Sequence, residues 1–115
     1  MTVVKFLVNQ QKLKGFEING HSSENCDDLL GKTVCAAVSS AAYMAANTVL
    51  EVIGQSAKVE ISDAKMFFEV EKPNEKTEAV LGGFRLHILQ LAEQYSNKIR
   101  VTDWKPHTYK VISEV

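Results

Sequence analysis

The sequence predicts a two-layer α+β sandwich, in the order strand, strand, helix, strand, strand, helix, strand. Three observations carry this prediction: short segments that alternate apolar and polar residues, two longer segments with helical periodicity, and turn residues between them. About five short strands form one sheet in this prediction, and both helices pack on it. At 115 residues the chain fits one domain, so residues 1–115 are assigned to a single unit.

The first two strands are predicted near the N-terminus. Thr2–Val8 is rich in β-branched and aromatic side chains, which favours a strand. The polar residues Gln10–Gly15 predict a hairpin turn, and Gly15–Asn19 then alternates as a second strand. Residues 20–31 are acidic and rich in turn formers, which predicts a loop.

A change to helical period marks Thr33–Ile53. Apolar residues recur there at steps of three and four, which predicts one buried helix face. These residues are Val34, Val38, Ala41, Ala45, Val49 and Val52. Gly54 is the natural end of this helix.

A second hairpin and a second helix follow. Lys58–Ser62 and Lys65–Glu71 alternate, with a turn at residues 62–64. Asn74 or Thr77 is expected to cap a helix that runs to about Asn97. Its predicted buried face contains Val80, Leu81, Phe84, Ile88, Leu91 and Tyr95.

Two glycines weaken the predicted second helix, and a last strand follows it. Gly82 and Gly83 fall inside the second helix, and each costs about 1 kcal/mol relative to alanine. Ile99–Trp104 then reads as the last strand, and Tyr109–Val115 is a candidate for one more edge strand.

The composition excludes several classes of partner. The formal net charge is −1, from 13 basic and 14 acidic side chains, so no basic excess exists to neutralise nucleic acid or an anionic membrane. No uninterrupted apolar run approaches the roughly 20 residues of a membrane span. The N-terminus does not resemble a signal peptide. We therefore expect a cytoplasmic protein with no membrane partner and no direct nucleic-acid partner.

The two cysteines, Cys26 and Cys35, do not form a disulfide-rich framework. In a reducing compartment a cysteine is core filler, a metal ligand or a reactive thiol. Cys35 is predicted in the first turn of the helix, where backbone N–H groups and the helix dipole favour a thiolate. The same N–H groups would stabilise an oxyanion, and His21, at a strand end, has the right chemistry for a general base and acid.

Each of these residues also has an ordinary explanation. A cysteine among alanines on an apolar helix is usually packing filler, and a histidine after a glycine at a strand end usually lies at the surface. Residue types alone therefore leave the role of His21 and Cys35 open.

The local sequence around this pair resembles a known signature. Gly20-His21, an acidic loop, and the run Val34-Cys35-Ala36-Ala37-Val38-Ser39 are similar to the motif of the Prp family of ribosomal-processing cysteine proteases. The order of elements and the length agree over essentially the whole chain, although only residues 20–39 are specific. The resemblance implies a catalytic dyad of His21 and Cys35, with Gly20 and Ser39 at the substrate. Ser39 has an equally good explanation as a small residue that permits close packing of the helix.

The resemblance also implies a substrate and an assembly. Family members remove an N-terminal extension from the precursor of a large-subunit ribosomal protein and form homodimers. No cofactor and no metal are implied.

One departure from the family motif concerns the acid expected three residues before the cysteine, where this chain has Lys32. Asp27 or Asp28 is placed to supply an acid from the loop instead, and Thr33 is placed to cap the helix.

Two other interpretations compete with a protease. A metal site would use His21, Cys26 and Cys35 with either His87 or His107, but the close ligand pairs of a structural zinc site are absent from the sequence. A non-catalytic ribosome-associated binding module of the same fold is the other, and Lys32 is its best support.

Overall fold

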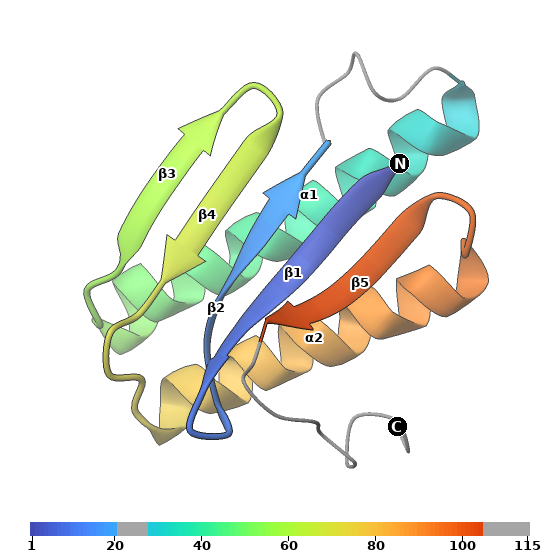
Figure 1. Cartoon of the computed structure of the whole chain (residues 1–115). Helices are drawn as coiled ribbons and strands as arrows, with labels where there is room; N and C mark the ends of the chain where they lie inside the picture. Colours follow the sequence, from blue (N-terminus) through green and yellow to red (C-terminus); the bar gives the residue numbers. More distant parts are fainter. Residues whose placement is uncertain (21–27, 105–115) are drawn as a thin grey trace.

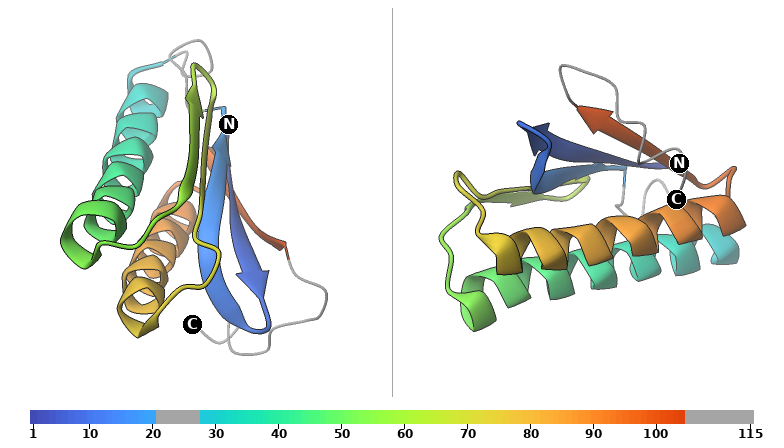
Figure 2. Two further views of the ribbon diagram at one scale, coloured as in Figure 1. Left: turned by 90° about the vertical axis from the view of Figure 1, so that its left-hand side faces the viewer. Right: turned by 90° about the horizontal axis from the view of Figure 1, so that it is seen from below.

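The computed structural model describes residues 1–20 and 28–104. Within these residues it contains five strands in one sheet and two helices, in the predicted sequence order. The strands lie side by side as β3-β4-β2-β1-β5, and both helices cover the same face of the sheet (Figure 1, Figure 2). The predicted two-layer α+β fold is therefore confirmed, while the expected edge strand at Tyr109–Val115 lies outside the described residues.

The first hairpin joins β1 (Thr2–Asn9) to β2 (Lys12–Asn19). Its turn consists of Gln10 and Gln11, whose φ angles are 54° and 66°. Two consecutive positive φ angles are typical of a type I′ turn, which matches the twist of the strands that it connects. The turn is thus shorter than predicted, and β2 begins three residues earlier.

The second hairpin, β3 (Lys58–Ser62) and β4 (Lys65–Glu69), adds to β2 through β4. Gly15 was predicted where the turn ends and the second strand begins, but it lies inside β2 where this pairing occurs. A Cβ at Gly15 would collide with the carbonyl oxygen of Phe68 in β4. The close approach of β4, rather than a turn, therefore requires glycine here.

On the other side of β1 lies β5 (Ile99–Trp104), which runs parallel to it. Thr2 is opposite Ile99, and the Thr2 N–H donates to the carbonyl of Lys98 at 2.9 Å. The start of β1 is therefore held between two neighbouring strands, because Val3 also pairs with Asn19 of β2.

The first helix, α1 (Leu29–Asn47), begins four residues before the predicted start at Thr33. Asp28 is its N-cap, and its Oδ1 accepts from the Gly31 N–H at 2.6 Å. Thr33 is not a cap, because its hydroxyl donates to the carbonyl of Leu29 within the first turn. The acidic residues that predicted a loop thus include the residue that starts the helix.

A π-helical segment, η2 (Thr48–Ile53), continues α1 and ends at Gly54, as predicted. Gly54 is left-handed with φ 85°, and its N–H donates to the Val49 carbonyl. Val49 is buried, but Val52 was wrongly predicted to be buried and is 79% exposed. The wider π turn shifts the positions that face the sheet, so an α-helical spacing fails at this end.

The second helix, α2 (Glu75–Gln94), is uninterrupted. Asn74 is its cap, since its Oδ1 accepts from the Thr77 N–H at 2.9 Å. A Cβ added at Gly82 or Gly83 would meet nothing within 4 Å, so neither glycine is required by packing. The predicted buried face is confirmed, with Leu81, Phe84 and Ile88 buried.

The core lies between the sheet and the helices. Phe84 of α2 packs against Phe6 and Phe16 of the sheet, with ring centroids 5.6 and 4.7 Å apart. At its edge Arg85 donates to Asp103 of β5 through Nε (3.2 Å) and Nη2 (2.7 Å), and its guanidinium lies over the Phe6 ring. This two-pronged ion pair ties α2 to β5.

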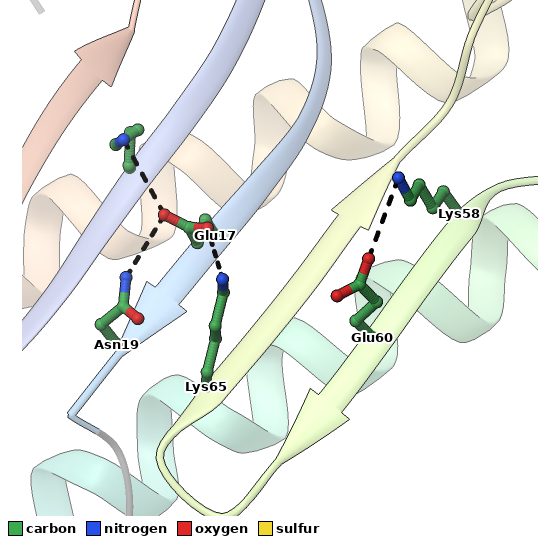
Figure 3. Close-up of polar contacts among 6 residues, drawn as sticks. Glu17, Asn19, Lys58, Glu60 and Lys65 are labelled. Carbon is green, nitrogen blue, oxygen red and sulfur yellow. Dashed lines mark hydrogen bonds and ion pairs between the residues drawn. The ribbon is translucent and has the colours of Figure 1, made fainter.

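The opposite face of the sheet is charged and solvated. Glu17 forms an ion pair with Lys65 at 3.3 Å and accepts a hydrogen bond from the side chain of Asn19 at 3.3 Å. Lys58 and Glu60 form a second ion pair at 3.9 Å (Figure 3). Exposed pairs of this kind contribute little stability.

Although the sequence predicted no span, the joined helix Leu29–Ile53 is long and apolar enough to cross a membrane by length and composition, with an 18-residue window of mean hydropathy 1.3 that is 39% buried. Its apolar residues include Val34, Val38, Ala42 and Val49, which are all buried in the core. These residues form the stripe of the helix that packs on the sheet, as in a core helix.

Candidate active site

A pocket of about 150 Å³ opens where α1 begins, beside the start of β1. Its lining residues are Met1, Thr2, Asp28, Gly31, Val34, Cys35, Asn97 and Lys98. They come from the start of β1, the first two turns of α1 and the turn before β5. The predicted nucleophile therefore lies in a cavity that three separate segments of the chain build.

Cys35 is the seventh residue of α1, so its predicted place in the first turn is wrong. It shares one helix face with Asp28 and Gly31, at spacings of three and four residues. At 1.5 Å per residue, Cys35 lies about 10 Å along the axis from the cap. Because the influence of the helix dipole falls off within the first turn, it does not account for a thiolate at Cys35.

Two of the backbone donors expected for an oxyanion at the helix start are already occupied. The Gly31 N–H is already bonded to Asp28, and the Lys32 N–H donates to the Asp28 carbonyl at 3.0 Å. Cys35 lies within the helix, where each N–H bonds to the carbonyl four residues earlier. Among the described pocket residues, the side-chain N–H donors are Asn97 and Lys98.

The sulfur of Cys35 lies in a buried environment. Cys35 is 9% exposed, and its Sγ is 3.5 Å from the Oγ1 of Thr2. Cys35 is disulfide-bonded in this structure, a role that the composition did not predict. Because a nucleophile must be a thiolate, any chemistry of this sulfur belongs to the reduced protein.

Asp28 supplies an acid to the pocket. Its Oδ2 pairs with the Nζ of Lys98 at 3.1 Å, and its Oδ1 caps the helix. The Gly31 N–H first, and then the Lys98 ammonium, hold the pKa of this carboxyl below its ordinary value of 3.8. Lys32, by contrast, is exposed and does not line the pocket.

The position of Asp28 bears on the missing family acid. Asp28 lies seven residues before Cys35, one helical turn earlier than Lys32, and therefore on the same side of the helix. Of the two aspartates suggested by the sequence, it is the one within the described residues.

Gly20 connects β2 to the pocket. Its φ is 82°, and a Cβ there would lie 2.7 Å from the carbonyl oxygen of Met1. Its N–H donates to the Ala64 carbonyl at 2.8 Å, which fixes the strand end. Gly20 therefore lies against the same segment of β1 that contacts Cys35. The next residue, His21, lies outside the described residues, so the dyad stays a prediction.

The other candidate residues lie elsewhere. Ser39, predicted to contact substrate, is partly buried on α1 and is not among the residues that line the pocket. His87 is exposed and lines a groove between α1 and α2, apart from the pocket of Cys35. In the described parts of the chain, no three histidine, cysteine, aspartate or glutamate side chains are grouped to hold a metal ion. Cys26 and His107 lie outside those parts.

The sequence reasoning missed Thr2 and Lys98. Thr2 continues the alternation of the buried residues Val4, Phe6 and Val8 along β1, and it is the one polar member of that face. A polar residue in a buried strand position was therefore a usable signal. Lys98 gave none, because only the parallel pairing of β5 brings it to α1.

The family model for "Cysteine protease Prp" matches residues 1–100. No curated protein matches the chain significantly. Among solved structures, SMU.848 from Streptococcus mutans superposes with a TM-score of 0.80 at 21% identity, over 90% of this chain and 99% of that one.

The essential ribosomal processing protease Prp from S. aureus is also similar. In complex with a substrate peptide it gives a TM-score of 0.80 at 17% identity, over 90% of this chain and 100% of that one. In complex with a covalently linked product peptide it gives a TM-score of 0.74 at 18% identity, over 90% of this chain and 100% of that one. At these identities the structures support the fold, while the match to the family model covers most of the sequence. The chain belongs to the Prp family of cysteine proteases.

Proposed function

We propose that Cys35 is the nucleophile of this protease and that His21 is its general base and acid. The observation that carries the proposal is the convergence at the start of β1: Gly20 packs on Met1, and Thr2 contacts the sulfur of Cys35. The backbone that leads into His21 therefore leaves the sheet beside the pocket of Cys35. The motif resemblance supports the same pair.

The mechanism is peptide hydrolysis through an acyl-enzyme. His21 takes the proton of the Cys35 thiol, and the thiolate attacks the scissile carbonyl. The tetrahedral intermediate collapses as His21 protonates the leaving amine, which leaves an acyl group on the sulfur. Water, deprotonated by His21, then attacks the thioester and releases the acid and the thiol. Asn97 and Lys98 are the candidates for holding the oxyanion, since both line the pocket and carry N–H donors.

The proposed substrate is the precursor of a large-subunit ribosomal protein, from which the enzyme removes an N-terminal extension. The S. aureus relative, described as a ribosomal processing protease and solved with a substrate peptide, supports this substrate class. No cofactor enters the mechanism. The same family resemblance leads us to propose a cytoplasmic location.

We further propose a homodimer that associates through the outer face of the helices. A groove of about 770 Å³ lies between α1 and α2, and most of its lining is small or apolar. Met44, at this groove, is 67% exposed. An apolar groove between helices is a suitable surface for a second copy of the chain.

The test is to incubate the reduced protein with the extended precursor. We expect one cut by the wild type, no cut by Cys35→Ala, and a loss of about 10²–10⁴ in rate for His21→Ala. His87→Ala is the matched control, because this histidine is exposed and is not among the residues that line the pocket of Cys35, and this variant should cleave normally. A wild type that leaves the precursor intact would refute the substrate.

A non-catalytic ribosome-associated module is the second candidate, favoured by Lys32 in place of the family acid. Alkylation of the reduced protein at pH 6–7 separates the two. A catalytic Cys35 reacts far faster than Cys26, whereas a binding module gives equally slow labelling of both.

A further inference from the structure

The hydroxyl of Thr2 has an unusual position. Thr2 is 1% exposed and lies on the inner face of β1. The remaining residues of that face are all apolar. Its Oγ1 lies 3.5 Å from the Sγ of Cys35, 33 positions away in the sequence. Within the described residues this sulfur is the hydrogen-bond partner of the hydroxyl. Burying a hydroxyl at a site that valine would fill costs free energy unless it makes such a bond.

The backbone holds this hydroxyl in place. Thr2 donates its N–H to the Lys98 carbonyl at 2.9 Å and pairs in register with Ile99. On the other side, Gly20 packs directly on the Met1 carbonyl. Since threonine is also restricted at χ1, the hydroxyl has little freedom to turn away from α1.

The direction of the hydrogen bond follows from the chemistry of sulfur. In the reduced protein, either the Thr2 hydroxyl or the Cys35 thiol can donate in this contact. A thiolate carries no proton, however, so in the nucleophilic form the hydroxyl must donate and the sulfur must accept. A hydrogen bond to an ionised acceptor is roughly twice as strong as one between neutral groups.

We propose that Thr2 is a positioning residue for the reaction: its hydroxyl orients the sulfur of Cys35 and stabilises the thiolate. This inference rests on the proposed function only in taking Cys35 as the nucleophile. It fills a gap that the helix leaves, because Cys35 lies beyond the first turn, where the dipole is effective.

The charged side chains of the described pocket residues do not replace the hydroxyl. Among the described residues, the charged side chains that line the pocket are Asp28 and Lys98. Asp28 and Lys98 form an ion pair with each other, so their charges largely cancel at the sulfur. Among the described pocket residues, Thr2 places a neutral donor in contact with Sγ.

The experiment compares Thr2→Val, which keeps the shape and removes the hydroxyl, with Thr2→Ser, which keeps the hydroxyl. The pH profile of Cys35 alkylation by iodoacetamide is measured on the reduced proteins, and peptide mass spectrometry counts Cys26 separately. We expect the midpoint for Thr2→Val to rise by about one pH unit, equal to about tenfold less thiolate below both midpoints. Thr2→Ser should stay near the wild type.

Circular dichroism checks that each variant is folded. If Thr2→Val does not fold, Thr2→Ala replaces it as the variant without a hydroxyl. An unchanged midpoint in the hydroxyl-free variant would overturn the inference. An equal rise in Thr2→Ser would do so as well, because it would assign the effect to packing rather than to the hydroxyl. The assay contains no substrate. An uncut precursor would therefore refute the proposed function while leaving the shift intact.

Discussion

Replacing Gly20 with alanine tests how the backbone before His21 is held at the pocket. Gly20 has φ 82°, and the added Cβ would lie 2.7 Å from the Met1 carbonyl oxygen. The substitution therefore strains the backbone and pushes on the first residues of β1. Gly82→Ala is the matched control, because a Cβ in that helix would meet nothing within 4 Å.

The magnitudes follow from these two environments. A non-glycine residue in the left-handed region costs about 1–2 kcal/mol, and a forced shift of packed backbone costs about 1–3 kcal/mol more. We expect Gly20→Ala to lower the free energy of unfolding by about 3 kcal/mol. Gly82→Ala should raise it by about 1 kcal/mol, since alanine is the better helix former.

Urea denaturation of the reduced proteins measures both changes. Cleavage of the precursor, assayed in the folded range, should fall in Gly20→Ala because Met1 and Thr2 shift against the sulfur, and it should be unchanged in Gly82→Ala. The reasoning is refuted if Gly20→Ala is as stable as the wild type, or if both substitutions change stability in the same direction.

Three further predictions concern stability and assembly. The pKa of Asp28 is lowered, chiefly by the Gly31 N–H. The stabilisation that ionised Asp28 gives the folded protein is therefore complete above pH 3.8, the ordinary pKa, and is lost as the pH falls through the lower pKa of the folded state. Asp28→Asn still accepts the cap bond but does not titrate, so its thermal midpoint should fall less than that of the wild type from about pH 5 to about pH 2; equal slopes would contradict this. Asp103→Ala leaves the 9% exposed Arg85 unpaired, so urea denaturation should show a loss of about 3 kcal/mol, and a loss below about 0.5 kcal/mol would show that the pair is not needed. Met44→Glu should halve the mass measured by light scattering without changing the thermal midpoint, whereas a mass that stays at two copies would exclude the groove as the interface.

Much of the fold follows from local pattern. Alternation along β1 and helical spacing around Leu81, Phe84 and Ile88 predicted the elements, because burial against one layer imposes the period on the sequence. The start of α1 escaped this reasoning. Leu29 is 81% exposed and follows the acidic residues, so neither periodicity nor composition signalled a helix there.

The site was less accessible to sequence reasoning. The motif predicted Cys35 but not the contact between its sulfur and the hydroxyl of Thr2. This contact depends on how β1 packs against α1. The parallel pairing of β5 brings Lys98 to Asp28, across 70 positions of sequence. Long-range contacts of this kind leave no local period, although the polar residue on the inner face of β1 was a partial sign.

Mass spectrometry of the reacting protein tests the central claim most directly. The reduced enzyme is mixed with the extended precursor, quenched in acid during turnover and digested, and the peptides are searched for a covalent acyl adduct. We predict a thioester on the sulfur of Cys35 in the wild type, and neither adduct nor cleavage in Cys35→Ala. Cleavage that continues in Cys35→Ala, or an adduct on Cys26 instead, would contradict the assignment of Cys35 as the nucleophile.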